Sequence, residues 1–219
     1  MKKAIFFILT MAAACIFTGA LPAFSAEHAH MEAKNQAATV TKLADLKAGL
    51  RDLWIGHVFW VRNVVVATKY GDNEAAKVAE AAVVENAKAI AGSIEPFYGK
   101  AASDKLFGLL AGHYGAVKEY MTSAYANDKT GKDSSRDKLI RNADEIAVFL
   151  SGANPYLPKE TLYGLLTAHG GHHMKEIEAL ASKNYAEEAQ VWSDMKAHMY
   201  VIADALAGGL AKQFPEKIR

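Results

Sequence analysis

Apolar residues recur along most of the chain at the three- and four-residue spacing of amphipathic helices, and no segment alternates at every second residue as a strand does. Alanine, leucine, lysine and glutamate, all strong helix formers, dominate these stretches. Turn-forming residues such as Asn154-Pro155 separate the periodic segments. The pattern predicts an all-α, up-down bundle in a single domain over 40–214. Its six helices are expected at about 40–69, 74–95, 102–126, 134–152, 159–182 and 186–213.

The sequence also repeats itself with a period of 56 residues. This shift superposes LRDLWIGH (50–57), LFGLLAGH (106–113) and LYGLLTAH (162–169). Each copy spans two predicted helices, so the bundle is predicted to consist of three tandem helical hairpins. Both a closed bundle and a short two-layer stack are compatible with this repeat.

Each repeat has a histidine on its first predicted helix and an asparagine or histidine 29 residues later on its second. The pairs are His57 and Asn86, His113 and Asn142, and His169 and His198. The two members of a pair lie equally far from the turn between their helices, so an antiparallel hairpin holds them at one height. Counting about 100° per residue centres the first-helix histidines in apolar stripes. We therefore expect a polar layer inside the core, made of His57, His113, His169, Asn86, Asn142 and His198.

The fifth predicted helix carries the densest candidate chemistry, in the stretch TAHGGHHMKEIE (167–178). His169, His173 and Glu176 lie along one strip of this helix, with His172 at its edge. Imidazole and carboxylate groups at helical spacing suit zinc, copper, iron, nickel or manganese. The sequence therefore predicts a transition-metal site on His169, His173 and Glu176. The further candidate ligands are His172, Asp194, His198, His113 and His57.

Other interpretations of the same residues stay open. A layer of buried hydrogen bonds can fix the register of a bundle without any metal, which would make the protein a structural or interaction module. Paired histidines beside Trp54 and Trp60 could instead serve as axial ligands of a haem. A metal-dependent small-molecule enzyme would need an open coordination position next to a pocket.

The N-terminal stretch MKKAIFFILTMAAACIFTGALPAFSA (1–26) has the layout of a secretory signal peptide: two lysines, an apolar run and small residues at the end. Cleavage after residue 25 or 26 would leave a flexible tail over 27–39. The protein is therefore expected to be exported, to the periplasm or the extracellular space, with no membrane span once the signal is removed. The single cysteine, Cys15, lies in the signal, which excludes disulfides, thiolate ligands and c-type haem attachment in the exported chain.

Charge argues against several partner classes. Without Lys2 and Lys3, the 25 basic residues fall to 23, against 24 acidic ones. There is no basic stripe and no glycine-rich phosphate loop, so nucleic acids and nucleotides are not expected as ligands. A metal ion or another small ligand fits this composition better.

Three segments, LWIGHVFWVRN (53–63), NADEIAVFLSGANPYLP (142–158) and LLTAHGGHHMKEIEAL (165–180), resemble a family of functionally uncharacterised bacterial helical proteins. The resemblance covers most of the chain after the signal peptide, and the His172-His173 pair departs from it. It implies an exported helical protein and carries no activity, cofactor or site residue with it.

Overall fold

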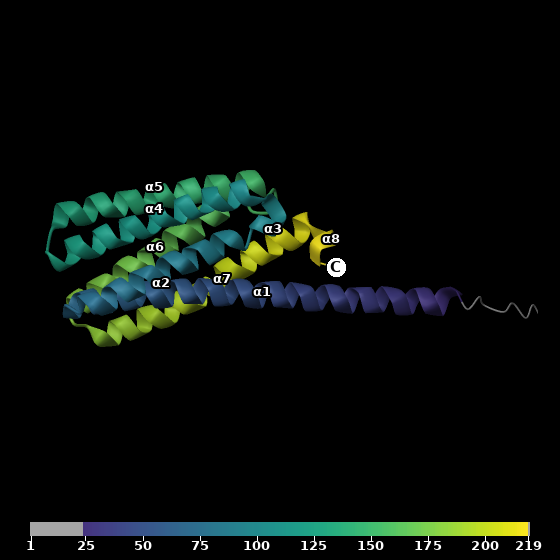
Figure 1. Ribbon diagram of the computed structural model, residues 1–219, viewed down its shortest axis with the longest axis horizontal. Coiled ribbons are helices and arrows are strands. Elements are labelled where there is room, and N and C mark those ends of the chain that lie inside the picture. The colour runs from purple at the N-terminus through teal and green to yellow at the C-terminus, as the bar shows by residue number, and fades with distance from the viewer. Residues whose placement is uncertain (1–23, 219) are drawn as a thin grey trace, which may run out of the picture.

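The computed structural model of the protein describes residues 24–218, which form eight helices and no strand (Figure 1). Six of the helices are long and two are single turns, so the predicted all-α bundle is confirmed. None of the helices in this part of the chain is long and apolar enough to cross a membrane. The helices are α1 (Phe24–Tyr70), α2 (Asn73–Gly92), α3 (Glu95–Tyr98), α4 (Lys100–Tyr125), α5 (Lys129–Ala153), α6 (Lys159–Ala181), α7 (Tyr185–Gln213) and α8 (Pro215–Ile218).

The first helix is longer than predicted. It begins at Phe24 instead of near residue 40, so the segment 27–39, expected to be a flexible tail, is helical and continues past the end of the bundle (Figure 1). The physical reason is composition, because this segment contains no glycine or proline and is rich in alanine, a strong helix former. The predicted signal peptide, 1–26, lies outside the described residues except for its last three.

The three hairpins turn in the same way. In each hairpin, one residue of the turn between the two helices has a positive φ. These residues are Gly71 (75°), Asn127 (54°) and Lys183 (59°). The next residue caps the second helix, and its side chain accepts a hydrogen bond from the backbone N–H three residues further on. These caps are Asp72, Asp128 and Asn184, again 56 residues apart.

The bundle is closed, because the first helix packs against the last. α1 contacts α7, and each long helix also contacts the next one along the chain. α6 is the most central helix, since it touches α5, α7, α4 and α1. Because α6 is surrounded by these helices, its side chains at successive turns of one face can reach the same interior site.

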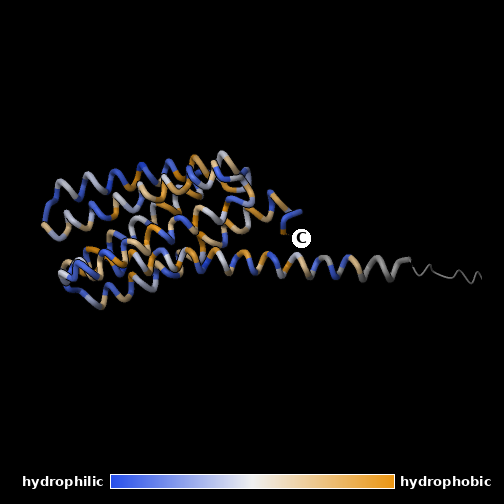
Figure 2. The backbone as a smooth tube through the Cα atoms, in the orientation of Figure 1, coloured by the Kyte–Doolittle hydropathy of each residue, from blue (hydrophilic) through white to orange (hydrophobic). Residues whose placement is uncertain are grey.

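A layer of histidines divides the apolar core. On α1, Trp54 and Val58 belong to one apolar cluster and Val61 to another, with His57 among them. On α4, Leu110 and Ala116 belong to the same two clusters and flank His113. Figure 2 shows the hydrophobic positions recurring along the helices where they face one another. Polar side chains are therefore held at mid-height between two apolar halves.

Each hairpin is joined at this height by a side-chain hydrogen bond from its second helix to a backbone carbonyl of its first. Asn86 Nδ2 donates to Leu53 O at 3.0 Å, and Asn142 Nδ2 donates to Leu109 O at 2.9 Å. In the third hairpin His198 Nε2 lies 2.8 Å from Leu165 O. All three contacts span 33 residues. Polar groups of this kind can set the register of each hairpin.

Candidate metal centre

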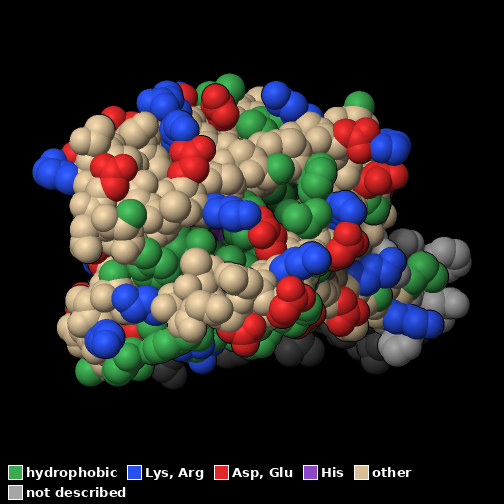
Figure 3. All heavy atoms as spheres, turned by 60° about the vertical axis from the view of Figure 1, so that its left-hand side comes forward, with side chains coloured by type: hydrophobic (Ala, Val, Ile, Leu, Met, Phe, Trp, Pro, Cys, Tyr) green, Lys and Arg blue, Asp and Glu red, His purple; other side chains and the backbone are tan. Residues whose placement is uncertain are grey.

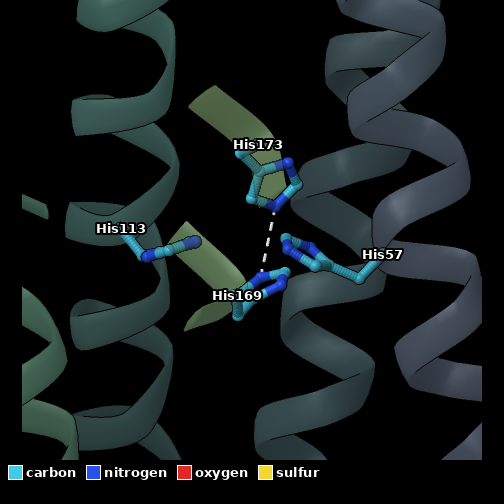
Figure 4. A group of neighbouring side chains, drawn as sticks. All are labelled: His57, His113, His169 and His173. Atoms are coloured by element: carbon cyan, nitrogen blue, oxygen red, sulfur yellow. Dashed lines mark hydrogen bonds between the residues drawn. The ribbon is translucent and has the colours of Figure 1, made fainter. Parts of the chain in front are cut away.

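Four histidines converge in the middle of the bundle. His57 comes from α1, His113 from α4, and His169 and His173 from α6 (Figure 4). One nitrogen of each ring can be chosen so that all four lie within 4.8 Å of one another. The rings point toward a common centre from three sides of the interior (Figure 4).

The spacing of the rings suits a single metal ion. The Nε2 atoms of His169 and His173 lie 3.2 Å apart. In a tetrahedral zinc site with Zn–N bonds of 2.0–2.1 Å, neighbouring nitrogens are separated by roughly 3.3 Å. His169 and His173 already have this separation, because residues four apart on a helix stand one above the other. The chosen nitrogens of His57 and His113 lie within 4.8 Å of these two and of each other.

All four side chains are buried, with His173 fully inaccessible. Burial, together with a smaller effect of the neighbouring His113, lowers the pKa of His57 to about 3. Burial also lowers the pKa of His113 to about 4, against a small opposing effect of the Asn142 side chain. For His169 and His173, burial and then the nearby histidines hold the pKa well below its usual value. The rings are therefore neutral near pH 7, which is the form that binds metals.

Several of these ring nitrogens have no partner in the protein. His113 Nε2 and the Nδ1 atoms of His169 and His173 are buried without a hydrogen bond. A buried polar atom left unpaired costs about 1–3 kcal/mol. A cation held between the Nε2 atoms would use the unpaired His113 Nε2, whereas the Nδ1 atoms of His169 and His173 would stay unpaired.

Glu176, predicted as a ligand, is fully buried on α6 but does not join the four histidines. Its nearest charged neighbour is Arg62, whose Nε lies 3.6 Å from Oε1, too far for a hydrogen bond. Arg62 instead donates to Glu188 Oε1 at 2.5 Å. Burial raises the pKa of Glu176 to about 8, against the opposing effect of Arg62. Glu176 is therefore a neutral acid at pH 7, one turn beyond the site.

Three other predicted ligands also lie outside the cluster. Asp194 is exposed and accepts a hydrogen bond from Gln190, because Met195 and Met199 occupy the inward positions of α7. His172 and His198 are only half-buried and face each other, with ring centroids 5.4 Å apart. Residue counting gave the correct height for these side chains, but their direction around the helix axis points away from the four buried rings.

Sequence reasoning missed Glu188, which is buried at the start of α7 beside Arg62. Its spacing was a usable signal, because it continues the buried stripe of Val191, Met195, Met199 and Ile202 by one helical step. For Trp54 the sequence indicates only a place beside paired histidines. In the structure its ring lies 6.2 Å from that of His57 and 6.4 Å from that of His169.

Comparison of the chain with protein-family models, curated proteins and solved structures found no match. The four buried, neutral imidazoles could hold one metal ion.

Proposed function

We propose that this protein is an exported metal-binding protein that holds one transition-metal ion between His57, His113, His169 and His173. The convergence of four neutral imidazoles on one buried point carries the proposal. Imidazole nitrogen is a good ligand for zinc, copper, nickel and iron. Export is supported by the signal-like layout of residues 1–26.

The proposal favours an ion over a haem. The four rings are packed against one another, with centroids of His169 and His173 only 4.4 Å apart. The cavity beside them is about 20 Å³, room for roughly one water molecule. A macrocycle between two axial imidazoles needs a flat slot far larger than this.

Metal analysis of the protein, purified without a histidine tag, tests the proposal. After treatment with a chelator and incubation with zinc, copper, nickel or iron(II), we expect one equivalent of metal per chain to remain after dialysis. His173→Ala should lose this metal. His172→Ala is the matched control, since His172 is the adjacent residue but lies outside the cluster, and it should retain the metal.

The proposal is contradicted if His173→Ala and His172→Ala lose the metal to the same extent, or if both of them retain it. A wild-type protein that binds no stoichiometric metal of the four would remove it altogether.

A structural or interaction module is the second candidate, favoured by the hydrogen bonds of Asn86, Asn142 and His198 that join the hairpins. The two functions differ in the response to His169→Leu. A core that only packs should tolerate this replacement or gain stability from it, with or without zinc. A metal centre should lose the stabilisation that zinc gives to the wild type.

The observed surface fits either candidate. On the face in Figure 3, basic and acidic side chains are interspersed and no patch of one sign covers it. This face gives no support to a nucleic-acid partner.

A further inference from the structure

An apolar cavity adjoins the candidate metal centre toward one end of the bundle. It has a volume of about 30 Å³, room for roughly two water-sized atoms, and its walls are almost entirely apolar. Leu50, Leu106 and Leu210 contribute to these walls, near the end at which α3 and the loop after α5 lie. Water needs several polar partners to enter such a space, and an apolar cavity of this kind stays dry.

A second, smaller cavity lies against the histidines themselves and is lined in part by His57, His113 and His169. The two cavities share four wall residues, which are Trp54, Ile90, Leu110 and Ile146. They therefore stand on either side of the same few side chains, and together they run from the end of the bundle to the imidazoles.

Trp54 is the polar feature of this shared wall. It is 5% exposed, and its indole Nε1–H is buried without an acceptor. A phenylalanine could fill the core here without leaving an N–H unpaired, a defect that costs about 1–3 kcal/mol. The indole is thus a donor without a protein acceptor, at the boundary of two cavities that suit only very small and mostly apolar molecules.

We propose that these two neighbouring cavities bind a diatomic-sized, apolar molecule, of the class of dioxygen, and hold it beside the histidine cluster. Its size is set by the two volumes and its apolarity by the walls, and the Trp54 indole, which lines both cavities, can report its presence. Binding in the cavities is independent of a metal. Only the use of the bound molecule at a metal rests on the proposed function.

Dioxygen itself is the probe for the test, because it is paramagnetic and speeds the relaxation of nearby nuclei. The experiment uses chelator-treated, ¹⁵N-labelled protein, so its result does not depend on metal binding. The three indole N–H resonances, from Trp54, Trp60 and Trp192, are followed as oxygen pressure is raised. Trp60 and Trp192 are half-buried and report on dissolved oxygen at the surface.

We expect the buried Trp54 resonance to relax faster with oxygen pressure, and Ala153→Met to reduce this effect, since Ala153 lines the apolar cavity at the end of α5. Ala89→Met, on the exposed face of α2, is the control and should leave it unchanged. Leu206→Phe fills the same cavity from α7 and replaces Ala153→Met if that variant does not fold. No oxygen effect at Trp54, or an effect unchanged by both cavity-filling variants, would overturn the proposal while leaving the metal centre standing.

Discussion

His169 and His173 hold their Nε2 atoms 3.2 Å apart, one turn from each other on the most central helix of the bundle. In a metal-free protein this contact requires one ring to donate and the other to accept, since two neutral imidazole lone pairs repel at this distance. A cation between them uses both lone pairs at once. The tightest contact of the cluster is therefore the one that metal binding would change most.

Metal binding should stabilise the folded protein. A ligand that binds only the folded state adds about 2.7 kcal/mol when its concentration is 100 times the dissociation constant. We expect the melting temperature to rise with zinc concentration in the wild type and in His172→Ala, and to stay constant in His113→Ala. Calorimetry at several zinc concentrations measures this, and an equal rise in all three proteins would show that the ion binds elsewhere.

The stability of the metal-free protein should fall on acidification. The pKa is about 3 for His57 and about 4 for His113 in the folded protein, against about 6.5 in the unfolded chain. Below pH 6.5 these histidines therefore become protonated in the unfolded chain but stay neutral in the folded protein. Each such histidine should cost about 1.4 kcal/mol per pH unit, down to its folded pKa.

Urea unfolding of chelator-treated protein at a series of pH values measures this slope. His113→Leu should make it shallower by the share of one histidine over the range between pH 6.5 and pH 4. A slope that is unchanged in this variant would mean that His113 already titrates normally in the folded protein.

Glu176 should give a pH dependence of opposite sign. Its pKa is raised from 4.5 to about 8, so between these values the folded protein keeps a proton that the unfolded chain has released. Its contribution to stability therefore falls as pH rises through this range. Glu176→Gln removes the titration and should stabilise the metal-free protein at pH 7 by up to about 3 kcal/mol.

The measurement is again urea unfolding, now of Glu176→Gln against the wild type from acid to mildly alkaline pH. The gain should grow with pH above 4.5 and level off near 8. A constant difference across this range would show that Glu176 is ionised in the folded protein, paired with Arg62.

The amide that joins the second hairpin should matter for stability. Asn142 is buried, and its Nδ2 donates to the Leu109 carbonyl at 2.9 Å. Asn142→Ala leaves that carbonyl without this donor and should cost about 1–3 kcal/mol. Asn63→Ala is the control, because Asn63 Nδ2 bonds only to Phe59 O in an exposed turn of its own helix. Equal losses in the two variants, measured by denaturant unfolding, would contradict this role.

Two adjacent glycines near the end of α7 should respond oppositely to alanine. A Cβ on Gly209 would lie 2.7 Å from Leu157 Cδ2, so Gly209→Ala should destabilise by about 1–3 kcal/mol. A Cβ on Gly208 would meet nothing within 4 Å, so Gly208→Ala should stabilise by about 0.5–1 kcal/mol through helix propensity. Thermal unfolding of both variants decides this, and the same sign for both would show that Leu157 moves aside.

The sequence predicted heights better than directions. Equal offsets from successive turns correctly placed His57, His113 and His169 at one level inside the core, and helical spacing added His173. The same counting failed for Asp194, which is at a suitable height but lies on the outer face of α7. A direction around the helix axis depends on which neighbours pack against it, and a single sequence does not contain that information.

Glu176 shows the other limit of sequence reasoning. Its burial was predicted from its strip on the helix, and it is fully buried. Its partner could not be predicted, because Arg62 and Glu188 come from α1 and α7, and the tertiary contacts that bring them together have no local signature. A buried carboxyl one turn from a histidine need not share that histidine's ligand.

The hydrogen bonds that join each hairpin bear on how the centre assembles. Each closes a span of 33 residues within one hairpin, so none of them depends on a contact between hairpins. The four imidazoles come from all three hairpins, so their meeting point exists only after the last docking event. A bound ion would then connect all three hairpins at one point and stabilise the contacts between them, in addition to the hydrogen bond within each hairpin.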